Sequence, residues 1–252
     1  MKNNNNVMSR AENIQWLSII ALGLFSLYLD YGYLQILINW VLIIILLGNA
    51  RRFYSDKNPK LFQFIRRSFY VFPLFIPIMF KHDSVFYASS NLILWILVGL
   101  IIGGAFVSIK LNEWRLLLSN DYLVLTKVSE NSHHFTMIFI LLGAAIGEEL
   151  FFRYFIIQSI NDEGVILGIF TSAFLFFLFH YGVKWASDFS KVDFIIQFTF
   201  GLLSATLFVL SGTIFPSIVA HLIFNLPHVI FHYKKIMMNK ENLSKERSGV
   251  HG

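Results

Sequence analysis

The chain has 252 residues, of which 56% are hydrophobic and only 14% are charged, and its mean hydropathy is +0.63. This composition excludes an ordinary soluble domain, in which about a quarter of the residues are charged, and predicts a protein with several membrane spans. The net charge of +5 requires no nucleic-acid partner because attraction to anionic lipid headgroups explains it, and the absence of cysteine excludes disulfides, thiolate zinc sites and cysteine nucleophiles.

Eight apolar windows are long enough, or nearly long enough, to cross about 30 Å of hydrocarbon. They fall at residues 13–29, 31–49, 68–80, 88–109, 135–158, 164–183, 193–211 and 213–233. The third window is short and contains Pro73 and Pro77, so we expect a kinked helix or one that gains length from Ser68 to Tyr70. No small-residue cleavage pattern follows the first window, which is therefore expected to remain as a helix. The fold class expected is an all-α polytopic membrane protein with about eight transmembrane helices.

The basic residues give this topology an orientation. If the N-terminus lies inside, all but two of the 20 basic residues fall on cytoplasmic segments; the exceptions are Lys81 outside and Arg153 in the membrane. Cytoplasmic loops carry the excess of Lys and Arg in membrane proteins. We therefore expect a multi-pass protein of the cell membrane with both termini in the cytoplasm.

Two features of the first half have a structural interpretation. Gly99, Gly103 and Gly104, with Ala105, indicate a surface for close helix packing. The longest interruption, residues 111–134, contains two short segments at 114–118 and 122–125 that form either an interfacial amphipathic piece or an ordinary solvated loop.

Two adjacent glutamates, Glu148 and Glu149, lie within the apolar stretch that runs from residue 135 to about 157. The bilayer penalises an ionised carboxylate that has no partner, so such residues are usually functional. Arg153 follows Glu149 by four positions and can form an ion pair with it on one helical face. Glu148 lies about 100° around the helix with no local partner, which makes it the leading functional candidate.

Two later windows contribute further polar groups. His180 lies in the sixth window, four positions after Phe176, and His221 and Asn225 lie four positions apart in the eighth. Residues four apart project from one helical face. Each pair alone is a weak signal, because histidine in a membrane helix often only bonds a neighbouring helix.

Together, the pattern Glu-Glu-x-x-x-Arg, then Phe-x-x-x-His, then His-x-x-x-Asn on three separate helices resembles the CAAX protease and bacteriocin-processing family. This family, also called CPBP or Abi, consists of intramembrane endopeptidases and includes the type II CAAX prenyl endopeptidases. The resemblance covers roughly residues 135–230. It implies a catalytic core formed by the last four helices at 135–233, preceded by variable helices and a cytoplasmic loop at 1–134 and followed by a basic cytoplasmic tail at 234–252.

Peptide hydrolysis requires a base that activates water and donors that hold the oxyanion of the tetrahedral intermediate. Glu148 and His180 can share the role of the base, while His221 and Asn225 offer an imidazole N–H and an amide N–H as the oxyanion pair. The resemblance implies the same roles for these four positions. Glu149 and Arg153 are expected to support the site as an internal ion pair.

Metal chemistry is the main alternative for this group of residues. The chain has neither the His-Glu-x-x-His motif of zinc proteases nor the paired Glu-x-x-His motifs of a di-iron bundle. Zinc is possible for two glutamates and two histidines, but we expect no cofactor.

The other polar residues of the spans are expected to be structural. The serines lack a Gly-x-Ser-x-Gly pattern and are interpreted as packing residues; they are Ser172, Ser204, Ser211 and Ser217. Four further histidines are given an interfacial or structural role; they are His133, His134, His228 and His232.

The function predicted from these observations is that of an intramembrane, glutamate-dependent endopeptidase. Its partners would be the lipid bilayer and a membrane-associated peptide or protein substrate. A composition rich in Asn, Lys, Ile and Phe suggests a bacterial source, for which the resemblance implies peptide maturation or self-immunity to a bacteriocin. The alternatives are a proton-coupled transporter, although no inverted repeat is visible, and a non-catalytic family member that binds a membrane partner.

Overall fold

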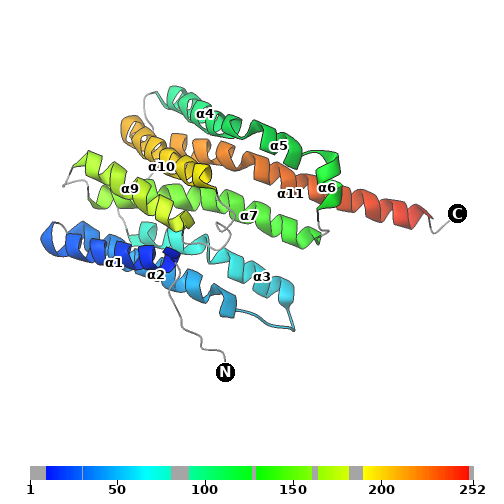
Figure 1. Ribbon diagram of the computed structural model, residues 1–252, viewed down its shortest axis with the longest axis horizontal. Helices are drawn as coiled ribbons and strands as arrows, with labels where there is room; N and C mark the ends of the chain where they lie inside the picture. The colour runs from blue at the N-terminus through cyan, green and yellow to red at the C-terminus, as the bar shows by residue number, and fades with distance from the viewer. Residues whose placement is uncertain are drawn as a thin grey trace.

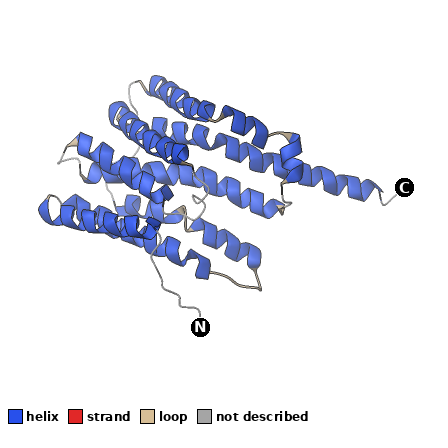
Figure 2. Ribbon diagram, viewed as in Figure 1, coloured by secondary structure: helices blue, strands red, loops and turns tan. Residues whose placement is uncertain are grey.

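The computed structural model describes residues 10–29, 31–80, 91–126, 129–160, 164–181 and 190–249, and within these ranges the fold is entirely helical (Figures 1 and 2). The elements in chain order are α1 (Arg10–Tyr28), α2 (Tyr31–Asn49), η1 (Ala50–Arg52), α3 (Pro59–Ser68), η2 (Phe72–Phe80), α4 (Leu92–Ile109), α5 (Leu111–Leu117), α6 (Asn120–Leu125), α7 (Asn131–Glu148), η3 (Glu149–Ile156), α8 (Ile157–Ser159), α9 (Val165–Tyr181), α10 (Lys191–Ser211) and α11 (Phe215–Gly249).

Among the described residues, five helical segments are long and apolar enough to cross a membrane. They are Tyr31–Asn49, Leu92–Ile109, Asn131–Ser159, Lys191–Ser211 and Phe215–Lys240. Residues 15–28 and 165–181 form shorter apolar helices. The all-helical membrane fold is therefore confirmed, whereas the count of eight spans is not.

The largest departure concerns the predicted span at 68–80. Ser68 ends α3, and Phe72–Phe80 forms a tight 3₁₀ helix of nine residues instead of a membrane-spanning α-helix. Pro73 and Pro77 explain the difference, since each lacks the N–H that a regular α-helix needs. The segment packs against α7, which ends at Glu148, because Gly143 and Gly147 of α7 lie against Val71, Leu74 and Phe75.

The helix α11 lies between α4 and α7 (Figure 1). Its close approach to α4 depends on two glycines. A Cβ atom at Gly103 would lie 2.5 Å from the Ala220 carbonyl oxygen, and one at Gly99 would collide with the Pro216 carbonyl oxygen. At Gly104, a Cβ atom would meet nothing within 4 Å. The predicted glycine surface is thus confirmed for Gly99 and Gly103 and wrong for Gly104.

This contact yields a first prediction. We expect Gly103→Ala to destabilise the fold by about 1–3 kcal/mol, the usual cost of overpacking, and to lower activity because Ala220 directly precedes His221. Thermal unfolding in detergent measures the effect. Gly104→Ala is the matched control and should leave the unfolding midpoint unchanged. A Gly103→Ala protein as stable and active as Gly104→Ala would contradict the packing described.

The helices α5 and α6 resolve the two interpretations of residues 111–134. Both short segments are helical, and α11 holds them through two lysines. Lys234 Nζ donates to the Leu118 carbonyl oxygen at 2.8 Å, and Lys235 Nζ donates to the Leu123 carbonyl oxygen at 2.9 Å. The interruption is therefore a docked helical piece. The residues predicted as a tail from 234 onward continue α11 as far as Gly249.

The ends of α10 are defined by local sequence. Ser190 and Asp193 form a reciprocal capping box at its start, and Lys110 at the end of α4 pairs with Asp193. Gly212 ends the helix with a φ of 66°, a left-handed conformation that glycine adopts without strain. The chain then turns directly into α11, which brings the beginning of α11 beside the end of α10.

The N-terminal helices pack against the rest of the bundle through Trp40 of α2. Its Nε1 donates to Ser18 Oγ of α1 at 3.0 Å. Its ring meets the Phe152 ring edge to face, with 6.4 Å between the ring centroids. Trp40 and Phe152 are both buried, within the largest apolar cluster of the described residues. The helix α2 therefore packs against the segment that carries Arg153, and α1 packs against α2.

Candidate active site

The segment that carries Glu149 and Arg153 is a π-helix, where the sequence predicted a regular α-helix. It runs from Glu149 to Ile156 and is buried along its whole length. Such π segments are rare and occur often at functional sites. Here it follows α7 without a break, so that Glu148 ends one helical form and Glu149 begins the other.

Glu149 is the centre of a fully buried polar network. Its Oε2 lies 3.0 Å from Arg153 Nε and accepts a hydrogen bond from Ser204 Oγ at 2.6 Å. Its Oε1 lies 2.7 Å from His221 Nδ1. The predicted ion pair between Glu149 and Arg153 is present, but the carboxylate also holds a serine from α10 and a histidine from α11.

Arg153 has a second stabilising neighbour. Its guanidinium lies over the ring of Phe176, 4.2 Å from the centroid, in a cation–π arrangement. Phe176 is itself buried and belongs to the Phe-x-x-x-His pattern of the sequence. The phenylalanine of that motif therefore supports the arginine of the glutamate motif across two helices.

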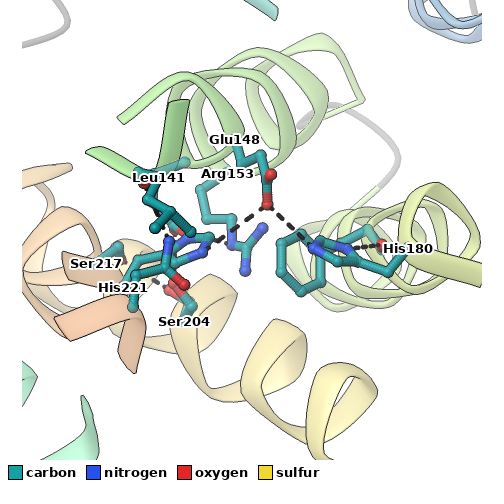
Figure 3. A network of polar contacts seen from close by, with 10 residues as sticks. Leu141, Glu148, Arg153, His180, Ser204, Ser217 and His221 are labelled. Carbon is teal, nitrogen blue, oxygen red and sulfur yellow. Dashed lines mark hydrogen bonds and ion pairs between the residues drawn. The ribbon is translucent and has the colours of Figure 1, made fainter. Parts of the chain in front are cut away.

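Glu148 lies between two histidines from different helices (Figure 3). Its Oε2 is 3.5 Å from His180 Nε2 of α9 and 3.9 Å from His221 Nε2 of α11. All three side chains are buried, and Glu148 Oε2 makes no hydrogen bond within the described residues. Both distances exceed ordinary hydrogen-bond lengths, and a water that bonds to Glu148 and to either histidine must lie to one side of the line that joins their atoms.

The partners of the two histidines indicate where their protons lie. His180 Nδ1 is 2.9 Å from the Phe176 carbonyl oxygen, which can only accept, so Nδ1 carries the proton and donates. His221 Nδ1 likewise donates to the Glu149 carboxylate. In the neutral form of each ring, Nε2 is then an acceptor. Both Nε2 atoms are directed at Glu148, so His180 can accept a proton from a water held there.

This tautomer also bears on the predicted oxyanion pair. A neutral His221 has no N–H at Nε2, and its Nε2 becomes a donor only when the ring is protonated. Glu149 accepts from the opposite nitrogen and so fixes the orientation of the ring. Glu149 thus orients His221 in addition to neutralising Arg153, which the sequence did not indicate.

Asn225 lies one turn after His221 on α11 and is less buried than the other site residues. Its Nδ2 donates to the Leu141 carbonyl oxygen of α7 at 3.1 Å. An amide NH₂ group has two N–H bonds, so one remains for another acceptor. No hydrogen bond between Asn225 and Glu148 is present among the described contacts.

Two residues of the network were missed by sequence reasoning. Ser204 and Ser217 were interpreted as packing residues, yet Ser204 donates to Glu149, and Ser217 Oγ donates to the Ser204 carbonyl oxygen at 2.9 Å (Figure 3). Serine is common in packed membrane helices, so its presence alone gave no signal. The only clue is position, because Ser217 lies four residues before His221 on the same face of α11.

Within the described residues, no group of three or more His, Cys, Asp or Glu side chains is arranged to hold a metal ion. Glu149 is engaged by Arg153 and Ser204, and His221 by Glu149.

Comparison with known families gives one finding. Residues 130–227 match the family model described as type II CAAX prenyl endopeptidase Rce1-like. The matched segment runs from just before α7 into α11, and Glu148, His180, His221 and Asn225 all lie within it. Curated proteins and solved structures give no match. The resemblance to the CPBP family of intramembrane proteases is confirmed for this segment.

Proposed function

We propose that the protein is an intramembrane endopeptidase in which Glu148 and His180 activate water, a proposal supported by the match of residues 130–227 to the Rce1-like family model. The observation that supports this most strongly is the position of Glu148. Its Oε2 has no hydrogen bond within the described residues and faces the acceptor nitrogen of His180 at 3.5 Å. A buried carboxylate with this environment is better suited to chemistry than to structural support.

A water held beside the two residues would donate one O–H to the Glu148 carboxylate and the other to His180 Nε2. As its oxygen attacks the scissile carbonyl carbon, one proton passes to this acid–base pair and the carbonyl oxygen becomes an oxyanion. Collapse of the intermediate breaks the C–N bond. The same proton then passes to the leaving nitrogen, so the step releases a carboxylic acid and an amine.

His221 and Asn225 are proposed as the donors to the oxyanion. Asn225 retains one amide N–H beyond its bond to Leu141, and His221 donates from Nε2 when it is protonated. Glu149 holds the ring in place through its contact with Nδ1. Donors held in place before the reaction stabilise developing charge at little reorganisation cost.

The substrate is proposed to be a membrane-associated peptide or protein, because a site this deep in an apolar bundle is reached most directly from the bilayer. The composition favours a bacterial cell membrane, and hence peptide maturation or self-immunity to a bacteriocin. The role of the glutamate and the class of substrate are both part of this proposal.

Cleavage of anchored peptides tests the activity. The purified chain in liposomes is incubated with a mixture of N-terminally palmitoylated peptides of varied sequence, and mass spectrometry identifies the products. We expect discrete cleavage sites with the wild-type protein and none with His180→Ala. The same products from both proteins, or no products from either across the whole mixture, would contradict the proposed function.

Orientation forms a separate prediction. If the basic segments face the cytoplasm, reporter domains fused after Lys60, Leu125 or Lys240 should be active in the cytoplasm, and one fused at Gly164 should be active outside. Paired phosphatase and fluorescent-protein fusions measure this. An external signal at Lys60 would overturn the proposed orientation of both termini.

A further inference from the structure

A stripe of polar residues runs along α11 from the site toward the C-terminal end of the helix. Successive members are separated by four or three positions, which keeps them within roughly a quarter of the helical circumference. They are His221, Asn225, His228, His232, Lys235 and Asn239. Polar side chains at membrane depth are costly unless they face protein or water, so the stripe requires an explanation.

Three members of the stripe are bonded to α7, and their partners on α7 follow one another in the opposite chain direction. Asn225 donates to the Leu141 carbonyl oxygen at 3.1 Å, and Asn239 Nδ2 donates to Asn131 Oδ1 at 2.9 Å. Between them, the Nδ1 atoms of His232 and His134 lie 2.9 Å apart. The two helices therefore share a polar seam, defined here by these three pairs, which starts at the first residue of α7 and ends one turn from His221.

The end of the seam that is farther from Glu148 lies among polar groups. Asn131 begins α7, and Lys235 is bonded to the Leu123 carbonyl oxygen and to Thr126 Oγ1 of the docked helical piece. At 1.5 Å per residue, the α11 stripe extends about 27 Å from Asn239 to His221. The seam is thus long enough to connect the edge of the apolar region with the site.

The pair of His134 and His232 lies between the two asparagine contacts of the seam. His134 is buried, and its Nε2 has no hydrogen-bond partner among the described residues. Buried polar atoms of this kind are usually satisfied by ordered water. His133, the neighbour of His134, is bonded to Arg67 of α3 at 3.1 Å, so a further polar group flanks this pair.

We propose that the seam between α7 and α11 is the route by which water reaches Glu148. The His134–His232 pair would form hydrogen bonds with water midway along this route. The inference rests on the proposed hydrolysis, which consumes one water for each bond cut. Glu148, His180 and His221 are all nearly inaccessible at the surface, so the water must pass through the protein. The proposal assigns a function to His134 and His232, which the sequence left as structural residues.

The competing interpretation is that the same hydrogen bonds only hold the two helices together. The two interpretations differ in one observable property. A dry packing seam excludes ions as completely as the lipid-facing side of the same helix does, whereas a hydrated seam admits them. Accessibility to a small ion therefore separates the two without any substrate.

The chain contains no cysteine, so each introduced thiol is the only one in its variant and gives the whole labelling signal. Asn225→Cys on the seam is paired with Leu226→Cys, whose native side chain is 42% exposed on the outer face at the same depth. Leu141→Cys, beside His221 in Figure 3, is paired with Leu142→Cys on the exposed face of α7. Ag⁺, which is close to water in size, is added to membranes, and thiols left unprotected are counted with a maleimide after denaturation.

We expect Ag⁺ to protect the thiols at 225 and 141 at least tenfold faster than those at 226 and 142. Adding His232→Leu to Asn225→Cys should slow protection at least tenfold, while Tyr233→Leu, an exposed neighbour, should not. Equal rates within both pairs, or no effect of His232→Leu, would overturn the proposal. This assay involves no peptide cleavage. The water route can therefore be supported when the proposed hydrolysis is not observed, and it can be contradicted when hydrolysis is observed.

Discussion

Glu148→Gln should abolish turnover and leave the protein folded. General-base catalysis contributes about 10²- to 10⁴-fold, and glutamine retains the shape of the side chain while removing its basicity. Glu148 Oε2 makes no hydrogen bond within the described residues, so replacing the carboxylate removes no such bond at that atom and relieves the cost of burying a charge. Peptide cleavage and thermal unfolding in detergent, measured on the same preparation, test both parts.

Glu149→Gln is the matched control, one residue along the chain. It removes the negative charge that Arg153 contacts at 3.0 Å and weakens the contacts to Ser204 and His221. An uncompensated buried charge costs about 3–5 kcal/mol. We therefore expect a clearly lower unfolding midpoint for Glu149→Gln than for Glu148→Gln. Equal stability of the two variants, or full activity in Glu148→Gln, would show that the roles have been assigned to the wrong carboxylates.

Asn225→Ala carries the second large effect. If the amide stabilises developing negative charge, its loss should lower kcat by roughly 10²- to 10³-fold with little change in KM, because the interaction forms mainly in the transition state. Asn225→Asp should be worse, since it places an acceptor where a donor is needed. Some loss of stability is expected in both variants because the bond to Leu141 is also removed or altered. Steady-state kinetics on a cleaved peptide provides the measurement.

The same assay, repeated on protein treated with a chelator, tests the expectation that no metal is required. Asparagine is a poor ligand for zinc, whereas His180 and His221 are good ones. Activity that survives chelation and is lost in Asn225→Ala would support water activated by Glu148. Activity that returns only with added zinc, with Asn225→Ala nearly normal, would show that Glu148 and the histidines are ligands.

Local spacing predicted the parts of the site that lie on one helix. The ion pair of Glu149 and Arg153 follows from their separation by four residues, and the structure places His221 and Asn225 on the face of α11 that meets α7. The convergence of three helices followed from the resemblance to a family, because no local rule relates His180 to Glu148 across 32 positions of the sequence.

Other features depend on contacts between helices that spacing cannot reveal. Ser204 of α10 bonds Glu149 on another element, and the neighbouring Gly201 of α10 packs closely against Ala173 of α9. The π-helical form of residues 149–156 and the 3₁₀ form of 72–80 also differ from the predicted α-helices. Hydropathy counts apolar residues and is insensitive to the type of helix, so it could not distinguish the 3₁₀ form of residues 72–80 from an α-helix.

The most direct test of the central claim, that Glu148 activates a water for peptide hydrolysis, is cleavage of a lipid-anchored peptide in liposomes prepared in H₂¹⁸O. The wild-type protein should place ¹⁸O in the new carboxyl terminus, as detected by mass spectrometry, and folded Glu148→Gln should form no product. Product that lacks ¹⁸O, or labelled product formed at the wild-type rate by Glu148→Gln, would contradict this account.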